Sequence, residues 1–408
     1  MPLDKLNPVL EQEVQQLHEE GRAKLPERVI TGYEAPTGDR GPRYRIAGYD
    51  RSFIRMNTNS YLDLSKHPQM IAAADAATHE FGVGPGAVRF IDGTFVHHVQ
   101  LEEAIAQFSG YAAAKIFNSA YTANLALSLT ISSKQTYWIG DELNHNSIIR
   151  GMRIANVPRT NRSIFKHNDM DDLRRCLDEV PAEMERVCVI FDGIFSMRGD
   201  YAPMQEIKRI TDEYHDRFAQ GVLTIMDDSH GIAAYGDTGR GTPEYTGVPP
   251  DILIGTFGKA FGVNGGFIGG SEALIEAVRQ KADTYIYTNP LSVADCAAAV
   301  EAIRIVDSAE GRDKLQHLQA RIAQFRAGLE RLGYESIPGP HAVVPIVLRD
   351  TAKTHRLVQH FFEHGILVVG LTFPVVPRGD ETIRVQLNAG LTQADVNYAL
   401  EVLEQFGD

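Results

Sequence analysis

The sequence predicts an α/β protein built around a mostly parallel sheet. Short apolar runs alternate with longer stretches of helical periodicity, and this alternation is typical of βαβ units. The runs cover residues 115–118, 135–139, 187–191, 222–226 and 252–255. A short run without polar interruption suits a strand that is buried on both faces of a parallel sheet.

The remaining elements divide the chain into three parts. Residues 1–52 should form an amphipathic helix over 8–24 and an arm that packs on a partner subunit or lines the active-site entrance; residues 53–290 should form the large domain, and residues 291–408 a smaller α+β domain. In the last part, apolar residues at helical spacing predict one helix near 315–332 and a final helix containing Val396, Leu400 and Leu403. Strands are expected at 342–348 and 366–370.

Composition excludes several classes of protein. A net charge of −13 over 408 residues argues against a general nucleic-acid binder. No apolar segment is long enough to cross a membrane, and the N-terminus lacks the apolar stretch of a signal peptide. Cys176, Cys188 and Cys296 have neither metal-ligand spacing nor a disulfide framework. We therefore expect a cytoplasmic protein with no metal site.

The chemistry is expected beyond the runs 222–226 and 252–255. The first run is followed by Asp227 and His230, and the second by Lys259. Ligands bind beyond the carboxyl ends of such strands, so a carboxylate, an imidazole and an amine should meet at one rim. A lysine can form a Schiff base with an aldehyde cofactor, and a buried carboxylate can keep a pyridine nitrogen protonated. Each residue alone could be ordinary surface, but the small residues around Lys259 favour a cofactor site.

Two segments carry a family resemblance. DDSHG (227–231) and GTFGKAFG (255–262) resemble motifs of the α-oxoamine synthases, which are pyridoxal 5'-phosphate (PLP) enzymes of fold type I, and the resemblance extends from about Asn57 to the C-terminus. It implies PLP as cofactor and a homodimer with shared active sites. It also implies that Lys259 binds PLP, that Asp227 contacts the ring nitrogen and that His230 contacts the phenolic oxygen.

Further cofactor contacts are implied by the same resemblance. The strand-to-helix turn of Ser119, Ala120, Tyr121 and Thr122 matches the phosphate-binding turn of the family, and a helix N-terminus suits an anion. His145 matches a histidine that stacks on the ring. Ser196 and Thr256 fall on positions near the cofactor, and Thr288 on a hydroxyl that the second subunit lends to the phosphate.

The resemblance also implies a carboxylate site. Arg384 falls on the arginine that holds the carboxylate of the amino acid, and Asn59 on an accessory contact. Asn59 and Thr288 both match positions that suggest sharing between subunits. Arg198 replaces the usual acidic residue of its turn, so it either changes a surface contact or meets an anionic substrate. His98 matches a histidine of an inter-subunit loop, and we expect no catalytic role for it or for His97.

The implied reaction is a decarboxylative Claisen condensation of a small amino acid, glycine favoured, with an acyl-CoA to give an aminoketone. Its catalytic residues would be Lys259, Asp227, His145 and His230. Segment 368–387 most resembles the 2-amino-3-ketobutyrate CoA ligases, 195–207 the 8-amino-7-oxononanoate synthases, and 93–98 the serine palmitoyltransferases. Two alternatives stay open. One is transamination or retro-aldol cleavage on the same scaffold, and the other is a binding or regulatory protein without catalysis, against which Lys259 argues. Phe95, Phe373 and Pro374 would favour a short acyl chain.

Overall fold

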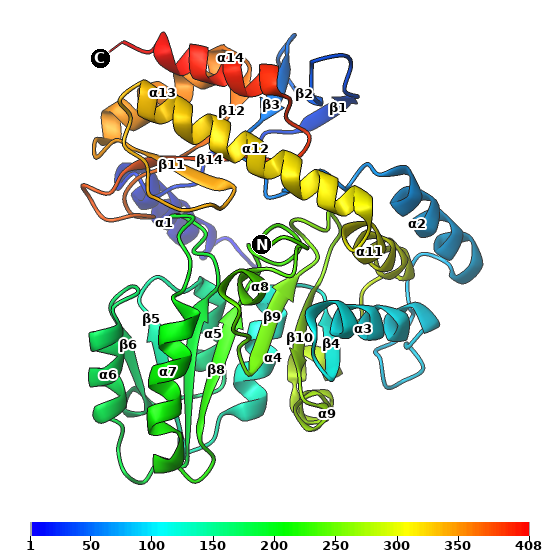
Figure 1. The fold of residues 1–408 in the computed structure, drawn as a ribbon, viewed down its shortest axis with the longest axis vertical. Helices are drawn as coiled ribbons and strands as arrows, with labels where there is room; N and C mark the ends of the chain where they lie inside the picture. The colour runs from blue at the N-terminus through cyan, green and yellow to red at the C-terminus, as the bar shows by residue number, and fades with distance from the viewer. Residues whose placement is uncertain (1, 408) are drawn as a thin grey trace.

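The computed structural model describes residues 2–407, which form three β-sheets with helices packed around them (Figure 1). The largest sheet has seven strands in the order β4-β10-β9-β8-β7-β5-β6. Only β10 runs against its neighbours, so the sheet is mostly parallel, as predicted. Its strands are β4 (Ala113–Phe117), β5 (Thr136–Asp141), β6 (Arg162–Phe165), β7 (Arg186–Asp192), β8 (Val222–Asp227), β9 (Ile252–Thr256) and β10 (Gly266–Gly270).

Helices cover both faces of this sheet, which explains why most of its strands are largely apolar. On β7, Cys188 and Ile190 belong to one apolar cluster, together with residues of α4 (Ala120–Ile131), α5 (Asn146–Ile154) and α9 (Glu272–Lys281). The alternate residues Val187, Val189 and Phe191 belong to the other cluster, with residues of α6 (Met170–Asp178) and α7 (Met204–Tyr214). Successive side chains of a strand point to opposite faces, so a strand covered on both sides must be apolar at every position.

Two strands of the large sheet carry no apolar run and were not predicted. Strand β10 has the sequence GFIGG, and its glycines permit close contacts. A Cβ at Gly266 would lie 2.2 Å from the amide nitrogen of Ala120, so β10 can approach the start of α4 only because position 266 lacks a side chain. Strand β6 (RSIF) lies at the sheet edge, where alternate side chains need not be apolar.

The two smaller sheets lie together above the large one (Figure 1). One contains β11 (Val343–Val347), β14 (Thr382–Gln386) and β13 (Val369–Leu371), and the other contains β1 (Ile30–Glu34), β2 (Arg43–Ile46), β3 (Ser52–Arg55) and β12 (Ile366–Leu367). The single strand predicted at 366–370 is therefore two strands that pair with different sheets. The segment 25–52, which we expected to be an arm, contains the hairpin β1–β2. The predicted domain boundaries at 52 and 290 remain predictions.

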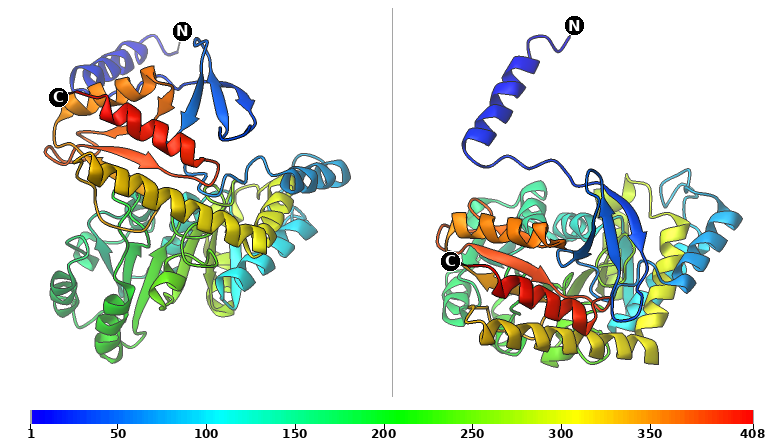
Figure 2. Two further views of the ribbon diagram at one scale, coloured as in Figure 1. Left: turned by 45° about the horizontal axis from the view of Figure 1, so that its top comes forward. Right: turned by 90° about the horizontal axis from the view of Figure 1, so that it is seen from above.

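The remaining helices lie around the three sheets or project from them. The predicted apolar stripe of α12 (Ala309–Arg331) is buried, with Leu315, Leu318, Ile322, Phe325 and Leu329 inside. The other helices are α1 (Asn7–Glu19), α2 (Pro68–Phe81), α3 (Val96–Ser109), α8 (Thr242–Thr246), α10 (Asp283–Ile286), α11 (Val293–Val306), α13 (Thr351–Glu363) and α14 (Gln393–Glu404). Helix α1 projects away from the rest of the chain (Figure 2), and all of its residues are exposed.

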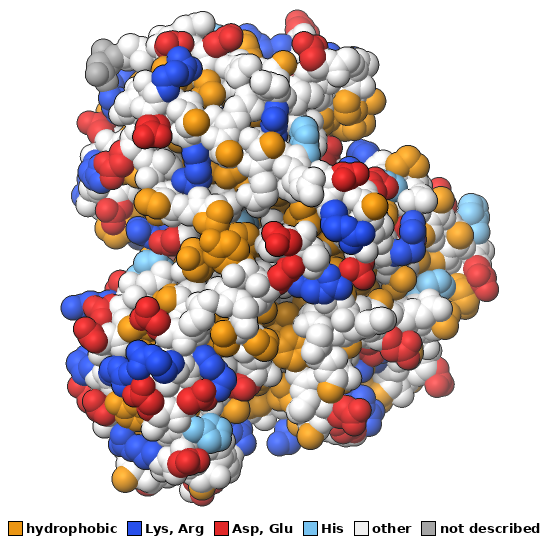
Figure 3. All heavy atoms as spheres, in the orientation of Figure 1, with side chains coloured by type: hydrophobic (Ala, Val, Ile, Leu, Met, Phe, Trp, Pro, Cys, Tyr) orange, Lys and Arg blue, Asp and Glu red, His pale blue; other side chains and the backbone are white. Residues whose placement is uncertain are grey.

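The surface carries acidic and basic side chains interspersed over both lobes of the face shown in Figure 3. Hydrophobic side chains gather between the lobes on that face. The net charge of −13 is thus not concentrated in one patch there. Among residues 2–407, no helix has the length and apolar character needed to span a membrane.

Candidate active site

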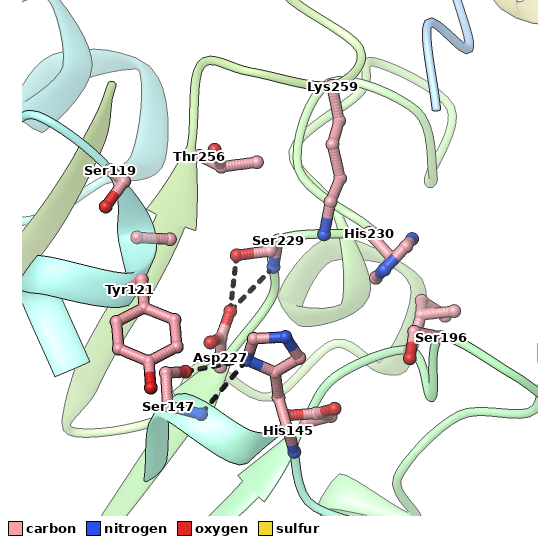
Figure 4. A pocket seen from close by; sticks show the side chains of 13 residues that line it. Ser119, Tyr121, His145, Ser147, Ser196, Asp227, Ser229, His230, Thr256 and Lys259 are labelled. Carbon is pink, nitrogen blue, oxygen red and sulfur yellow. Dashed lines mark hydrogen bonds between the residues drawn. The ribbon is translucent and has the colours of Figure 1, made fainter. Parts of the chain in front are cut away.

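A cavity of about 200 Å³ lies at the carboxyl ends of the parallel strands (Figure 4). Predicted residues that end or follow strands line it: His145, Ser196, Asp227, His230, Thr256 and Lys259. Ser119, Ala120 and Tyr121, from the N-terminus of α4, line it as well. Figure 4 shows Lys259 and His145 pointing toward this space from opposite sides. Sequence reasoning missed four further lining residues, Ser147, Asp192, Ile194 and Ser229.

Asp227, the last residue of β8, is buried and held by three hydrogen bonds. The side-chain amide of Asn124 donates to one carboxylate oxygen at 2.7 Å. The amide and hydroxyl of Ser229 donate to the other, at 3.1 and 2.5 Å. These contacts fix the carboxylate plane and compensate for the water lost on burial. Asn124 lies inside α4, where no sequence pattern marked it.

Lys259 is half-buried in the loop after β9. Burial lowers the pKa of its amine to about 8, although the negative charge of Asp227 opposes this shift. A substantial fraction of the amine is therefore neutral near pH 8. The neutral amine is the form that attacks an aldehyde and accepts a proton.

His145 precedes α5 and acts as its N-cap. Its Nδ1 accepts a hydrogen bond from the amide of Ser147 at 3.3 Å and lies 2.7 Å from the Ser147 hydroxyl. Burial lowers the pKa of His145, so its ring is neutral. The ring of Tyr121 packs against it edge-on, with 6.2 Å between centroids. The pair presents aromatic surface to one side of the cavity.

The N-terminus of α4 offers an anion site. The first amides of an α-helix lack partners within the helix, and here Ala120 and Tyr121 line the cavity. Thr122 does not line it, and its amide already donates to the Ser119 hydroxyl at 3.2 Å in a capping box. The prediction of a phosphate-binding turn therefore falls mainly on Ala120 and Tyr121.

Two further buried carboxyl groups accompany Asp227. Asp192, the last residue of β7, lines the cavity, and burial together with the charge of Asp227 raises its pKa well above the ordinary value. Burial also raises the pKa of Asp228 to about 7, against hydrogen bonds from the hydroxyl and amide of Thr242 at 2.6 and 2.9 Å. Of these three groups, Asp227 has the most donors around it.

Arg384 and Asn59 lie together beside the small sheet, outside the lining of the cavity. Arg384, on β14, donates to the side-chain oxygen of Asn59 at 2.9 Å, and Gln386 donates to the same oxygen. The Nε of Arg384 is buried and has no partner among the described residues. An unpaired guanidinium donor suits a carboxylate ligand.

Thr288 and Arg198 lie outside the cavity of their own chain. The Thr288 hydroxyl donates to the carbonyl of Thr284 at 2.8 Å. Because Asn59 contacts Arg384 of the same chain, Asn59 gives no support to a site shared between subunits, and that prediction rests on Thr288 alone. Arg198 pairs with Asp200 at 2.8 Å, which favours a surface contact over an anionic substrate.

These residues fit PLP by their chemistry. The cofactor has an aldehyde, a pyridine nitrogen, a phenolic oxygen and a phosphate. The site offers respectively an amine of lowered pKa, a buried and hydrogen-bonded carboxylate, a neutral histidine and a helix N-terminus. Strand β10 packs directly against the first turn of that helix, because Gly266 has no side chain.

Comparisons with known proteins agree with this chemistry. Residues 51–403 match the model of the aminotransferase class I and II family. An 8-amino-7-oxononanoate synthase from Thermosipho melanesiensis is 36% identical over 88% of this chain and 89% of its own length. A mitochondrial 2-amino-3-ketobutyrate coenzyme A ligase from Bos taurus is 35% identical over 99% of this chain and 93% of its own. The structure of a serine palmitoyltransferase from Sphingomonas wittichii superposes with a TM-score of 0.85 at 30% identity, covering 98% and 97% of the two chains. The chain is therefore an enzyme of the α-oxoamine synthase family, with the fold of class I and II aminotransferases and PLP as its cofactor.

Proposed function

We propose that this enzyme condenses a small amino acid, glycine favoured, with an acyl-CoA and releases CoA and then CO2 to give an aminoketone. The observation that carries the proposal is the arrangement around Lys259. An amine with a pKa of about 8 reaches a cavity that also holds the Asp227 carboxylate, while Arg384 lies beyond it with a free buried donor.

Each group then has a defined role. Bound PLP supplies an electron sink for the negative charge that develops at Cα. Asp227, held by Asn124 and Ser229, keeps the proton on the pyridine nitrogen. Lys259 would hold the aldehyde group of the cofactor, and its amine would accept the Cα proton of the amino acid. His145 contacts the ring and excludes water.

The remaining groups orient the cofactor and the substrate. Arg384 and Asn59 hold the α-carboxylate, and Ala120 and Tyr121 donate amides to the phosphate. His230 donates to the phenolic oxygen, whereas Ser119, Thr122, Ser196 and Thr256 support these contacts from the turns around them.

A small amino acid fits this site best. Within residues 2–407, Lys259 is the only cationic side chain that lines the cavity, so no second cation awaits an acidic substrate side chain. Tyr121 and His145 occupy one side of a space of only about 200 Å³. L-Alanine and L-serine are the next candidates, because one methylene changes affinity by only about 1–3 kcal/mol.

The acyl chain is proposed to be short. Phe373 is 46% exposed, with the Arg378 guanidinium 4.9 Å from its ring centroid, and Phe95 packs edge-on against Phe81. Bulky rings in these segments would limit the length of an acyl tunnel. A longer chain is the second candidate, which the similarity to 8-amino-7-oxononanoate synthases and serine palmitoyltransferases favours.

A matrix of substrates tests the function. Glycine, alanine and serine are each combined with acetyl-, propionyl-, hexanoyl- and palmitoyl-CoA, and free thiol is measured, with Lys259→Ala as the inactive control. We expect the highest kcat/KM for glycine with a short acyl-CoA. A rise toward palmitoyl-CoA with serine would favour the second candidate. Keto-acid or aldehyde formation without thiol release would show transamination or retro-aldol cleavage instead.

We also propose a cytoplasmic homodimer in which each subunit contributes Thr288 to the site of the other. Apolar side chains that a second copy could cover are exposed on α1 and on the loop before α3. They are Val9, Leu10, Val14, Val83, Phe90 and Ile91. Sedimentation velocity tests the dimer, and a monomer at micromolar concentration would exclude shared sites.

A further inference from the structure

Tyr61 has no part in the reaction described above, yet it contacts one of its residues. It lies in the segment between β3 and α2 and is fully buried. Its hydroxyl oxygen lies 2.7 Å from Nδ1 of His230, which lines the cavity. A tyrosine buried this deeply keeps its hydroxyl only where a partner satisfies it.

His230 carries a single ring proton. Burial lowers its pKa well below the ordinary value, and the positive charges of Lys259 and Arg384 act in the same direction. A neutral imidazole has one N–H group and one acceptor nitrogen. The partner at Nδ1 therefore decides whether Nε2 donates or accepts.

The surroundings of Tyr61 decide the direction of the hydrogen bond. Burial raises the pKa of Tyr61 to about 12, so the hydroxyl is protonated. The positive charge of Arg384 and the side chain of Gln386 both act to lower that pKa, which means that they favour negative charge on the Tyr61 oxygen. Among residues 2–407, Nδ1 of His230 is the only hydrogen-bond acceptor of this hydroxyl, so the hydroxyl proton is directed toward it. With Nδ1 as acceptor, the ring proton of His230 is on Nε2.

His341 holds His230 by its backbone. The Nδ1 of His341 accepts a hydrogen bond from the amide of Val343 at 3.1 Å, so its proton is on Nε2, which donates to the carbonyl of His230 at 2.8 Å. His341 is buried and packs edge-on against the ring of Tyr61, with 5.1 Å between centroids. His341 thereby holds the backbone of His230, and Tyr61 holds its ring.

We propose that Tyr61 is a positioning residue that holds His230 in the tautomer with its proton on Nε2, so that His230 presents a donor to the cavity. The consequence for PLP rests on the proposed contact between His230 and the phenolic oxygen. A donor at that oxygen stabilises its anionic form. The tautomer itself belongs to the protein without cofactor and can be measured there.

The first test uses the cofactor-free protein with nitrogen-15-labelled histidine. His230→Gln identifies the His230 signals in a long-range nitrogen–proton correlation spectrum. We expect the shift of a protonated nitrogen at Nε2 and of an acceptor nitrogen at Nδ1. The opposite assignment in the unsubstituted protein overturns the proposal, whatever the variants do.

The second test removes the Tyr61 hydroxyl and keeps the ring. Tyr61→Phe should give a mixture of His230 tautomers, and in the PLP-loaded enzyme it should lower the ratio of the long-wavelength to the short-wavelength cofactor band. We expect kcat to fall about three- to tenfold, with the KM for the amino acid within about twofold. An unchanged tautomer together with an unchanged band ratio contradicts the proposal.

Tyr111→Phe is the matched control. Its hydroxyl donates to the carbonyl of Pro250 at 2.8 Å, near the opposite end of β9 from the cavity, and its loss should change neither the tautomer nor the band ratio. Failure of the unsubstituted protein to bind PLP would count against the proposed function alone. The His230 tautomer in the cofactor-free protein would still decide the role of Tyr61.

Discussion

Asp192 and Asp227 face each other as register partners at the ends of β7 and β8, and both are buried. Two neighbouring buried carboxylates cannot both ionise without a large cost. Asn124 and Ser229 donate to Asp227, whereas burial and the charge of Asp227 raise the pKa of Asp192. Asp227 is therefore the ionised member of the pair and Asp192 the neutral one.

This division predicts opposite results for two isosteric substitutions. Asp192→Asn replaces a neutral acid by a neutral amide, so its exchange of the amino-acid α-proton with solvent should stay within about fivefold of that of the unsubstituted enzyme. Asp227→Asn removes the charge that holds the pyridine proton, so exchange of the amino-acid α-proton with solvent should slow by about 100-fold or more. NMR of glycine in deuterated buffer measures both. Equal losses would contradict the assignment.

The lowered pKa of Lys259 predicts how PLP binding depends on pH. Only the neutral amine attacks the aldehyde, and its fraction rises with pH through the pKa of about 8. The rate of PLP binding by cofactor-free enzyme should therefore rise with a midpoint near pH 8 and then level off. Stopped-flow absorbance measures this rate. Because Asp227 raises the pKa of Lys259, Asp227→Asn should move the midpoint to lower pH, and a shift to higher pH would refute this account.

His167 predicts a stability that depends on pH. It bridges Asp141 at 3.1 Å and Asp200 at 3.1 Å, and Arg198 also pairs with Asp200. Burial opposes its charge, but the two carboxylates outweigh burial and raise its pKa to about 9. In the unfolded chain the pKa of His167 is about 6.5. The stabilisation is therefore complete below about pH 6.5 and disappears as the pH rises through about 9.

We therefore expect His167→Gln to lower the free energy of unfolding by about 1.5–3 kcal/mol near pH 6 and by much less near pH 9.5. Urea unfolding at both pH values measures the difference. A double-mutant cycle with Asp141→Asn isolates the interaction energy between His167 and Asp141 from the individual effects of the two substitutions. The ring of His167 also packs edge-on against that of Phe195, with 4.3 Å between centroids, and a loss of equal size at both pH values would show that His167 acts only through this packing.

The fold could be predicted where burial left a pattern in the sequence. Strands β4, β5, β7, β8 and β9 are covered on both faces, so each is an apolar run. Strand β10 is equally central but carries glycines where Ala120 and Tyr111 approach it, and close approach removes the side chains that would reveal a strand. The hairpin of β1 and β2 is half exposed and gave no periodic signal.

The candidate site could be predicted only in part, for a related reason. Lys259, Asp227 and His230 follow apolar runs directly, so their positions mark them. Asn124 reaches Asp227 from 103 residues away, and Tyr61 reaches His230 from 169 residues away. Such contacts exist only once the chain has folded, and no local pattern records them.

Gly266 predicts a backbone requirement for cofactor binding. A Cβ at Gly266 would lie 2.2 Å from the backbone nitrogen of Ala120, so Gly266→Ala must displace the first turn of α4. We expect PLP to bind about tenfold more weakly or worse. Gly269→Ala, on the same strand, meets only the side chain of Tyr111 at 3.1 Å and is the matched control. Equal PLP affinities of the two variants, measured by equilibrium dialysis, would argue against the phosphate site at α4.

Thr288 predicts that activity can be restored by mixing two defective variants. Its hydroxyl does not face the cavity of its own chain, so Thr288→Val should weaken PLP binding only if the hydroxyl serves the neighbouring subunit. The expected loss is about 10- to 100-fold, the range for a hydrogen bond to a charged group.

The mixing experiment follows from that arrangement. In a heterodimer of Lys259→Ala and Thr288→Val chains, sharing gives one site with both an intact lysine and an intact threonine. A site built from one chain gives none, because each chain then lacks one of the two residues. After subunit exchange, proven by differently tagged chains, thiol release at limiting PLP should rise above that of either parent. Heterodimers that form without any such rise would show that Thr288 does not cross the interface.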